Sequence, residues 1–541
     1  MNLESFLHTF NHYLTGLPEQ FPWFVAFLLG TGIFITLRLG FIQFRRLKHA
    51  ADVVAGKYDN PEDAGDVTHF QALTVALSAT VGVGNIAGVA IAIHWAGPGA
   101  IFWMWMTAVF GMALKYAECT LAIKYREFDS EGNAAGGPMY YIEKGLGIKW
   151  PAVFFSICAV ICSFGTGNMA QSNTIASVSK DYLAPTITGL ILAVMVGAVI
   201  IGGVKRIASV TDKLLPGMAV FYFGSCALIL LMHMDQVPAA LMSIFENAFN
   251  TKSAFGGTAA AGFSAIMLKG VQRGLFSNEA GQGSAPIAHA SAKTDEPVRE
   301  GLVAMTGPLI DTLIICTLTA VTILVTGVWN QKFEQNFNPK SLDVCESIVG
   351  GSPVWLKESV KEIQFVDGVM QGAVFEYNHA TIDDYRLMLN NQAYSGSIKL
   401  ENHRLVLQGD EFSLAGKALL TGANLTGKAF QIGLSKLITW GDWIVDFSVL
   451  LFALSTIIGW SYYGDRSFQY LFGVRYLLIF RLLYLVFVFV GSITALDIVW
   501  AFGDIALSLM TIPNLLGVLL LSGVVVSQTN DYFSREHKPY K

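Results

Sequence analysis

The chain reads Thr-Val-Gly-Val-Gly-Asn-Ile-Ala-Gly from Thr80 to Gly88, inside an apolar stretch from about Phe70 to Trp95 that is long enough to cross a bilayer. Glycine inside a helix costs roughly 0.5–1 kcal/mol relative to alanine, so this cluster predicts a helix that unwinds in mid-membrane. Freed carbonyl oxygens at such a break can hold a cation, and the following half-helix can hold an anion at its N-terminus. Close packing of small residues is the structural alternative, but Thr80 and Asn85 favour a binding site.

Two more apolar stretches carry polar side chains that could contribute to the same site. One reads Gly-Thr-Gly-Asn-Met-Ala-Gln-Ser-Asn from Gly165 to Asn173. In it Asn168 and Gln171 are three residues apart and share one helix face. That face either lines a cavity or forms hydrogen bonds between helices. In the other stretch Thr456 and Trp460 are four residues apart, so they stack on one face.

Ionisable residues inside apolar stretches are the remaining candidates. Asp311 is a functional candidate because a carboxylate within the membrane is costly, although a hydrogen bond at a helix kink or an inner gate explains it equally well. Lys115 and Glu118 are three residues apart, and we favour a structural pair near the inner end of a helix.

The composition places the chain among polytopic membrane proteins. Of its 541 residues 53% are hydrophobic and 14% charged, and the mean hydropathy is +0.50, whereas soluble domains carry about 25% charged residues. The net charge of −5 does not set the orientation, which follows the local placement of Lys and Arg. The six cysteines show no CxxC spacing, and GxxxxGK[ST], HExxH and GxSxG are all absent. Zinc sites, ATP-binding loops and enzymatic activity are therefore not expected.

The apolar stretches predict an all-α membrane protein of about eleven transmembrane helices, the first covering residues 21–44. Basic clusters place the N-terminus outside and the C-terminus in the cytoplasm. A second broken segment is expected between Val237 and about Leu268, with glycines from Gly256 to Gly262. From Trp329 to about Thr426 the chain is polar, and the alternation in residues 394–407 predicts a β-hairpin that turns near residues 401–403. We expect this part to be a small extramembrane insertion with some β structure.

Three long strings, residues 80–90, 274–290 and 455–464, resemble the alanine or glycine:cation symporter family, the sodium:alanine symporters. The resemblance extends from about residue 70 to residue 470. It implies the leucine-transporter fold, in which two broken helices of a five-helix inverted repeat cross in mid-membrane and bind substrate and ion. The insertion departs from the short loop of the family pattern, and it could cap the outer vestibule, bind a partner or reflect neutral drift.

On this basis the chain divides as follows: 1–66, an N-terminal extra helix and a cytoplasmic connector; 67–236, the first inverted repeat, broken near 80–88; 237–328, the start of the second repeat; 329–430, the outer-side (periplasmic) insertion; 431–530, the rest of the second repeat; and 531–541, a cytoplasmic tail.

The resemblance also implies the site residues. The substrate carboxylate is expected to meet Thr80 and the backbone at the glycines, with Asn85 nearby. Gln171 or Asn168 meets the ammonium group or lines the pocket, and Phe276 and Trp460 form walls. The full set of substrate-site residues implied in this way is Thr80, Gly82, Gly84, Asn85, Asn168, Gln171, Phe276, Thr456 and Trp460. Sodium is expected between the carbonyl oxygens of Ser78 and Val81 and the hydroxyls of Ser455 and Thr456.

The leading hypothesis is a sodium-coupled secondary symporter of the bacterial inner (cell) membrane that takes up alanine and/or glycine by alternating access. It needs no cofactor besides sodium as coupling ion, and coupling to protons stays open because of His94 and Asp311. The alternative is an amino-acid sensor or receptor that uses a transporter-like core, with the insertion as its signalling or partner domain. Uptake that does not depend on the insertion would favour the transporter.

Overall fold

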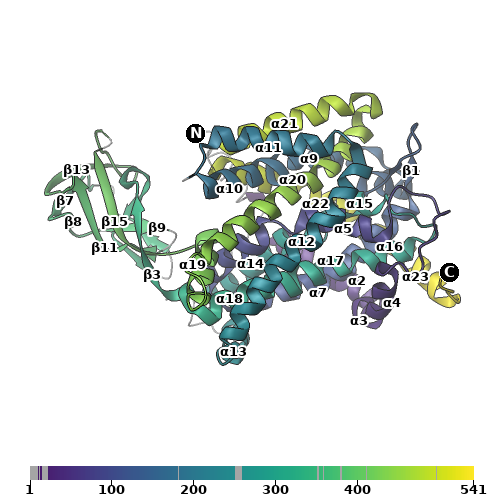
Figure 1. Ribbon diagram of the computed structural model, residues 1–541, viewed down its shortest axis with the longest axis horizontal. Helices are drawn as coiled ribbons and strands as arrows, with labels where there is room; N and C mark the ends of the chain where they lie inside the picture. The colour runs from purple at the N-terminus through teal and green to yellow at the C-terminus, as the bar shows by residue number, and fades with distance from the viewer. Residues whose placement is uncertain are drawn as a thin grey trace.

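The structure, a computed structural model, is a mostly helical body from which a smaller unit of strands projects, at the left in Figure 1. It describes residues 10, 13–14, 22–180, 182–249, 259–349, 352–357, 359–377, 380–409, 411–494 and 496–540. Within this part of the chain six helices are long and apolar enough to cross a membrane, or eight if each of two bent pairs is one span. The polytopic class predicted from composition is therefore confirmed.

The helices of the body form two runs, one before the strands and one after them. The first run is α2 (Trp23–Arg38), α3 (Ile42–Arg45), α4 (Leu47–Val54), α5 (His69–Thr80), α6 (Val89–Ala96), α7 (Gly99–Lys124), α8 (Pro138–Tyr140), α9 (Lys149–Phe164), α10 (Ala170–Ser179), α11 (Pro185–Ile200), α12 (Gly203–Met232), α13 (Val237–Ala248), α14 (Ala259–Asn278), α15 (Ala285–His289), α16 (Pro297–Ala304), α17 (Thr306–Pro308) and α18 (Thr317–Thr326). The second run is α19 (Gly422–Gly433), α20 (Asp442–Phe472), α21 (Leu477–Ile493), α22 (Leu496–Leu520) and α23 (Ser522–Ser534).

Short π-helical and 3-10 segments interrupt these runs. The π segments are η2 (Gly84–Gly88), η3 (Tyr141–Gly145), η4 (Gly165–Met169) and η5 (Leu309–Cys316), and the 3-10 segments are η6 (Val328–Asn330), η7 (Pro339–Ser341) and η8 (Val474–Tyr476). Single π turns inside helices are often found at functional sites.

The predicted first break is present and lies at residues 81–83, between α5 and η2. The helix α5 begins with a capping box, in which Thr68 accepts a hydrogen bond from the Gln71 amide and the Gln71 side chain accepts one from Thr68. It ends at Thr80, and the helix axis bends by 57° between α5 and the second half of the interrupted helix. Gly88 lies beyond the break, in the helical part.

The described residues contain a second break that lies beyond the segment predicted to hold it. Residues 256–258 of the predicted break lie outside the described residues, and Gly262 lies within the continuous helix α14. The chain unwinds between Asn278 and Ala285, where Gly281 and Gly283 have φ values of +84° and +82°. Three alanines before Gly262 favour helix, whereas these two glycines supply the left-handed backbone that ends it.

The first predicted span is also shorter than expected. Its helix α2 covers Trp23–Arg38, and the chain then turns through Gly40 and Phe41, which both have positive φ, into α3 and α4. Two consecutive left-handed residues cannot continue a right-handed helix, so the apolar residues up to Phe44 do not extend the span.

A buried carboxylate joins the two broken helices at one end. Glu300 of α16 accepts hydrogen bonds from Nδ1 of His69, at the start of α5, and from Nδ1 of His289, at the end of α15. All three side chains are buried. Arg126 donates to the carbonyl oxygens of Ala290 and Ala292 just beyond α15, so the end of the second broken helix is fixed as well.

The strands of residues 332–419 form a unit with its own hydrophobic core. They are β3 (Lys332–Phe337), β4 (Asp343–Cys345), β5 (Ser347–Val349), β6 (Ser352–Val354), β7 (Glu362–Val366), β8 (Val369–Met370), β9 (Val374–Tyr377), β10 (Ala380–Thr381), β11 (Asp383–Leu389), β12 (Gln392–Ala393), β13 (Gly396–Glu401), β14 (Arg404–Leu405) and β15 (Phe412–Leu419), while β1 (Glu127–Phe128) and β2 (Ala134–Ala135) form a separate hairpin in the body.

The strand unit contains a sheet in the order β10-β9-β4-β14-β13-β7-β8 and another in the order β12-β11-β15-β3. Val344, Phe365, Phe375 and Leu387 are fully buried in its core. The predicted hairpin is confirmed, because β13 pairs with β14 and the chain turns through residues 402–403. Lys332 pairs with Leu419 across β3 and β15, so the chain enters and leaves the unit at one place.

The segment predicted as an insertion, 329–430, also contains most of α19, which belongs to the helical body. Thr426 of α19 donates a hydrogen bond from Oγ1 to the carbonyl oxygen of Ile86 in η2, at 3.1 Å. This helix is too short to be recognised as a span, but it packs over the second half of the first broken helix.

We predict that Glu300→Gln lowers the melting temperature of the purified protein. Glutamine offers one acceptor oxygen where Glu300 offers two, so one buried imidazole loses its partner, at a cost of about 1–3 kcal/mol. Thermal unfolding followed in detergent measures the change. Glu296→Gln is the matched control, because Glu296 pairs with Arg535 at 2.8 Å on the surface, where ion pairs contribute about 0–1 kcal/mol. Equal melting temperatures for the two variants would contradict a stabilising role for Glu300.

Candidate functional site

A small cavity lies where the two breaks meet, between α5, α10, α14, α20 and α22. Its lining residues are Ala79, Thr80, Gly82, Gly84, Thr166, Gln171, Phe276, Glu279, Thr456, Trp460 and Leu507. The volume of the cavity is about 10 Å³, which is room for about one water molecule. An amino acid would therefore fit only after the walls move apart.

Glycines allow the close approach of the elements around the cavity. A Cβ at Gly82 would lie 2.4 Å from Oγ1 of Thr456, and one at Gly84 would lie 3.1 Å from Cδ1 of Phe276. A Cβ at Gly167 would lie 2.3 Å from Cγ of Trp460. The glycines predicted as signs of unwinding thus also let the side chains of other helices reach the break.

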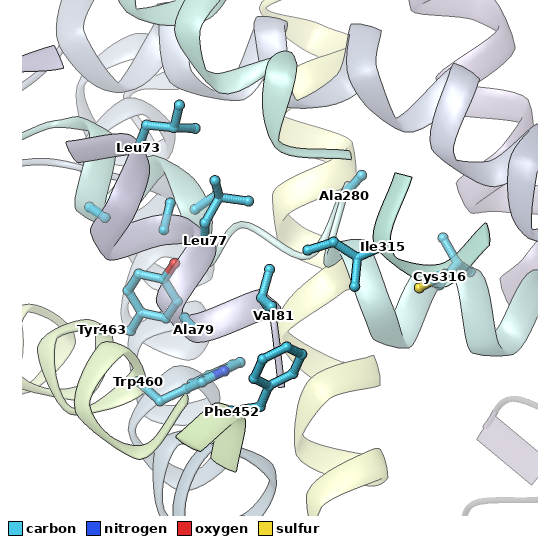
Figure 2. Packing of buried hydrophobic residues seen from close by; sticks show 14 of the residues in the cluster. Leu73, Leu77, Ala79, Val81, Ala280, Ile315, Cys316, Phe452, Trp460 and Tyr463 are labelled. Carbon is cyan, nitrogen blue, oxygen red and sulfur yellow. The ribbon is translucent and has the colours of Figure 1, made fainter. Parts of the chain in front are cut away.

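The walls predicted from α14 and α20 both contribute to the cavity. Trp460 is buried, its ring centroid lies 5.3 Å from that of Tyr463, and its Nε1 donates to Oε1 of Glu279 at 3.0 Å. Figure 2 shows Ala79 and Val81 of the first broken helix in the middle of this junction, with Trp460 and Tyr463 on one side and Ala280 and Ile315 on the other. Phe276 also lines the cavity, two residues before the end of α14.

Asn85 does not line the cavity but holds the first break in place. Its Oδ1 accepts a hydrogen bond from the Gly82 amide at 2.9 Å, and its Nδ2 donates to Oδ1 of Asp311 at 2.6 Å and to Oγ of Ser277 at 3.2 Å. The prediction that Asn85 lies beside the substrate carboxylate therefore finds no support in the geometry. The Gly82 amide is also already engaged, so it is less available to a ligand.

Of the two amide side chains predicted from residues 165–173, Gln171 lines the cavity and Asn168 does not. Asn168 instead donates from Nδ2 to the carbonyl oxygen of Tyr484 at 2.8 Å. The reason is the π turn η4, which rotates the helix relative to a regular α-helix and brings Thr166 to the cavity in place of Asn168.

The predicted sodium ligands lie at the junction of α5 and α20. The Gly82 amide donates to Asn85, which interrupts the helical hydrogen bond that the Ser78 carbonyl oxygen would otherwise accept. The hydroxyls of Ser455 and Thr456 are buried and have no hydrogen-bond partner among the described residues. Unpaired buried hydroxyls cost free energy, so these two have capacity for a further partner.

The charged candidates have structural partners. Asp311 accepts hydrogen bonds from Ser277 and Thr312 at 2.6 and 2.7 Å, in addition to Asn85, and does not line the cavity. The expected pair of Lys115 and Glu118 is absent from the ion pairs of the described residues, because Glu118 accepts from Nδ2 of Asn514 instead. Asn514 also donates to the carbonyl oxygen of Gly281 at 2.7 Å, which secures the second break.

Four residues of the cavity were not predicted from the sequence: Ala79, Thr166, Glu279 and Leu507. Glu279 lay in one of the quoted strings, two residues before Gly281, and its closeness to two glycines was a signal that could have indicated it. Thr166 required knowledge of the π turn, and Leu507 comes from a helix that carried no polar motif.

These features define a polytopic membrane protein with a small polar cavity between two interrupted helices. The model of the sodium:alanine symporter family matches residues 1–350 and 405–541. The chain belongs to this family. Residues 351–404, which the family model leaves unmatched, lie within the strand unit.

Individual relatives agree with this assignment. The chain is similar to the sodium/alanine symporter AgcS of Methanococcus maripaludis, with 39% identity over 538 residues that cover 98% of each chain. It is 31% identical to the amino-acid carrier protein AlsT of Bacillus subtilis over 536 residues, 98% of this chain and 93% of the relative. An uncharacterised transporter of Haemophilus influenzae is 38% identical over 538 residues, 99% of this chain and 97% of the relative.

We predict that Gly82→Ala abolishes amino-acid binding, whereas Gly88→Ala is tolerated. The added methyl group at position 82 meets Thr456 at 2.4 Å, but nothing lies within 4 Å of one at position 88. Binding of radiolabelled alanine to the purified variants measures the effect. Gly88→Ala is a matched control, since it makes the same chemical change in the same interrupted helix. Unchanged binding in Gly82→Ala would show that the close contact with Thr456 is unimportant.

Proposed function

We propose that this protein is a secondary symporter that takes up a small neutral amino acid, alanine and/or glycine, together with sodium. The observation that carries the proposal is the cavity, which brings seven of the nine predicted substrate residues together at one helix break. Membership of the sodium:alanine symporter family supports the coupling to sodium. An ion gradient supplies the energy, because binding alone only shifts the populations of conformations.

The architecture that we propose for this cycle is a five-helix inverted repeat with one additional N-terminal helix. Adding α2, α11 and the interrupted pair α14–α15 to the eight candidate spans gives eleven. An odd number of spans fits an N-terminus outside and a C-terminal tail in the cytoplasm of a cell (inner) membrane. Eight of the eleven proposed spans precede the strand unit, which fits a position of this unit on the outer side. Basic residues at the ends of the helices support this orientation.

In this proposal the substrate lies against the first break, between Trp460 and Phe276. Thr80 and the backbone near Gly84 meet its carboxylate, and Gln171 lines the pocket. The nearly closed cavity supports alternating access, because substrate can enter only when the walls separate on one side. The bulk of the two aromatic walls supports a preference for alanine or glycine over leucine.

Sodium in this proposal binds the carbonyl oxygens of Ser78 and Val81 and the hydroxyls of Ser455 and Thr456. Carbonyl oxygens of an unwound helix are common sodium ligands in transporters. The two unpaired hydroxyls support the site. Thr456 also lines the cavity, so it lies between ion and substrate.

Uptake of radiolabelled alanine into proteoliposomes tests the function. Accumulation that needs an inward sodium gradient, and that excess glycine but not leucine blocks, supports the proposal; potassium and proton gradients are the controls. A variant that lacks residues 332–419, joined by a short linker because Lys332 and Leu419 are paired, tests whether the strand unit is required. Binding without accumulation under every gradient would overturn transport and favour a sensor.

We predict that Ser455→Ala raises the sodium concentration for half-maximal uptake about tenfold, equivalent to about 1.4 kcal/mol. The affinity for alanine at saturating sodium should stay unchanged, because Ser455 does not line the cavity. Uptake measured over a range of sodium concentrations checks this. Ser448→Ala is the matched control, since the Ser448 hydroxyl on the same helix already donates to Ile444 at 2.6 Å. A similar shift in Ser448→Ala, or an equal loss of alanine affinity in Ser455→Ala, would contradict the ion site.

A further inference from the structure

Glu279 is the residue of the cavity whose role the proposed function leaves open. It lies in the unwound segment between α14 and α15, and its side chain is 5% exposed. Its φ of +53° is in the left-handed region, which non-glycine residues rarely adopt. Residues in such conformations cluster at ligand sites, where the surrounding structure holds them in place.

The hydrogen bonds of the Glu279 carboxylate come from neutral groups. Oε1 accepts from Nε1 of Trp460 at 3.0 Å and Oε2 accepts from Oγ of Ser284 at 2.6 Å. A carboxylate has about four acceptor positions, so two remain beyond these contacts. The carboxylate therefore has capacity for another donor.

No basic side chain of the described residues lies within ion-pair distance of Glu279. Lys115 acts on it only electrostatically, and the same lysine acts on Glu118 and Asp311. Of the described residues that line the cavity, Glu279 alone is ionisable. Burying a carboxylate away from water is costly unless an opposite charge compensates it, and this region has three carboxylates for one lysine.

We propose that Glu279 receives the ammonium group of the transported amino acid. This inference rests on the proposed function and replaces Gln171 and Asn168 as the partner of that group. A zwitterion that lies between the two breaks then has its carboxylate at the first break and its ammonium group at the second. Each interrupted helix recognises one end of the substrate, so closure around it requires both ends.

The competing role for Glu279 is to hold Trp460 in place without contacting the substrate. Glu279→Gln separates the two roles, because the amide oxygen can still accept from Trp460 Nε1 and the amide nitrogen can donate to Ser284 Oγ. The substitution removes the charge and keeps both hydrogen bonds. Ser284→Ala makes the opposite change, since it removes one donor to Glu279 and leaves the carboxylate.

The test measures equilibrium binding of radiolabelled alanine to the purified full-length protein at saturating sodium. In parallel, the rise in melting temperature caused by sodium alone shows whether each variant is folded and binds the ion. We expect Glu279→Gln to lose about 10- to 100-fold in alanine affinity and to keep the sodium-dependent rise. Ser284→Ala keeps the charge and should lose less than about tenfold.

Wild-type affinity for alanine in Glu279→Gln would overturn the inference and leave the symporter proposal intact. An equal loss of alanine affinity in Ser284→Ala, or a loss of the sodium-dependent rise in Glu279→Gln, would assign Glu279 to positioning and also overturn the inference. If the wild-type protein itself neither binds nor accumulates alanine, the proposed function fails and the inference falls with it.

Discussion

A helix that ends in the middle of a membrane-spanning segment leaves backbone N–H and C=O groups without partners, and in an apolar environment each unpaired group costs several kcal/mol. Side chains supply the missing partners at both breaks. Asn85 accepts from the Gly82 amide, and at the second break Asn278 accepts from the Ala280 amide. Gln282 donates to the carbonyl oxygen of Leu275 at 2.9 Å. The polar residues of the glycine-rich strings therefore form hydrogen bonds with the backbone at the breaks. The cavity is the space that remains between the two breaks.

The two breaks are also connected to each other. Asn85 reaches Asp311 and Ser277, so the first break is bonded to α14 and η5. Glu300 joins the start of α5 to the end of α15 through two histidines. Because these links are buried, a movement that opens the cavity must either keep them together or break them at considerable cost. Buried links of this kind favour movement of whole helices over local distortion.

The strand unit is separate from the interrupted helices and the hydrogen bonds that link them. It has its own core, and the family model leaves most of it unmatched. The two ends of the unit lie side by side, where β3 pairs with β15. The unit can therefore be inserted between two helices without a rearrangement of the helical body. Helix α19 follows it directly and belongs to the body through its contact with Ile86.

The sequence by itself determined the membrane class, the β-hairpin and the position of the first break, because hydropathy, alternation and glycine clusters are local properties. It also named Thr80, Phe276, Thr456 and Trp460 for the site through the family strings, and Gln171 through the polar residues of its own apolar stretch. The tertiary structure decided the second break, since whether a glycine adopts positive φ depends on its packing and not on its presence. It likewise turned Asn85 and Asn168 away from the cavity and brought Glu279 into it. A π turn and a left-handed residue set those directions, and both are maintained by contacts between helices that are far apart in the chain.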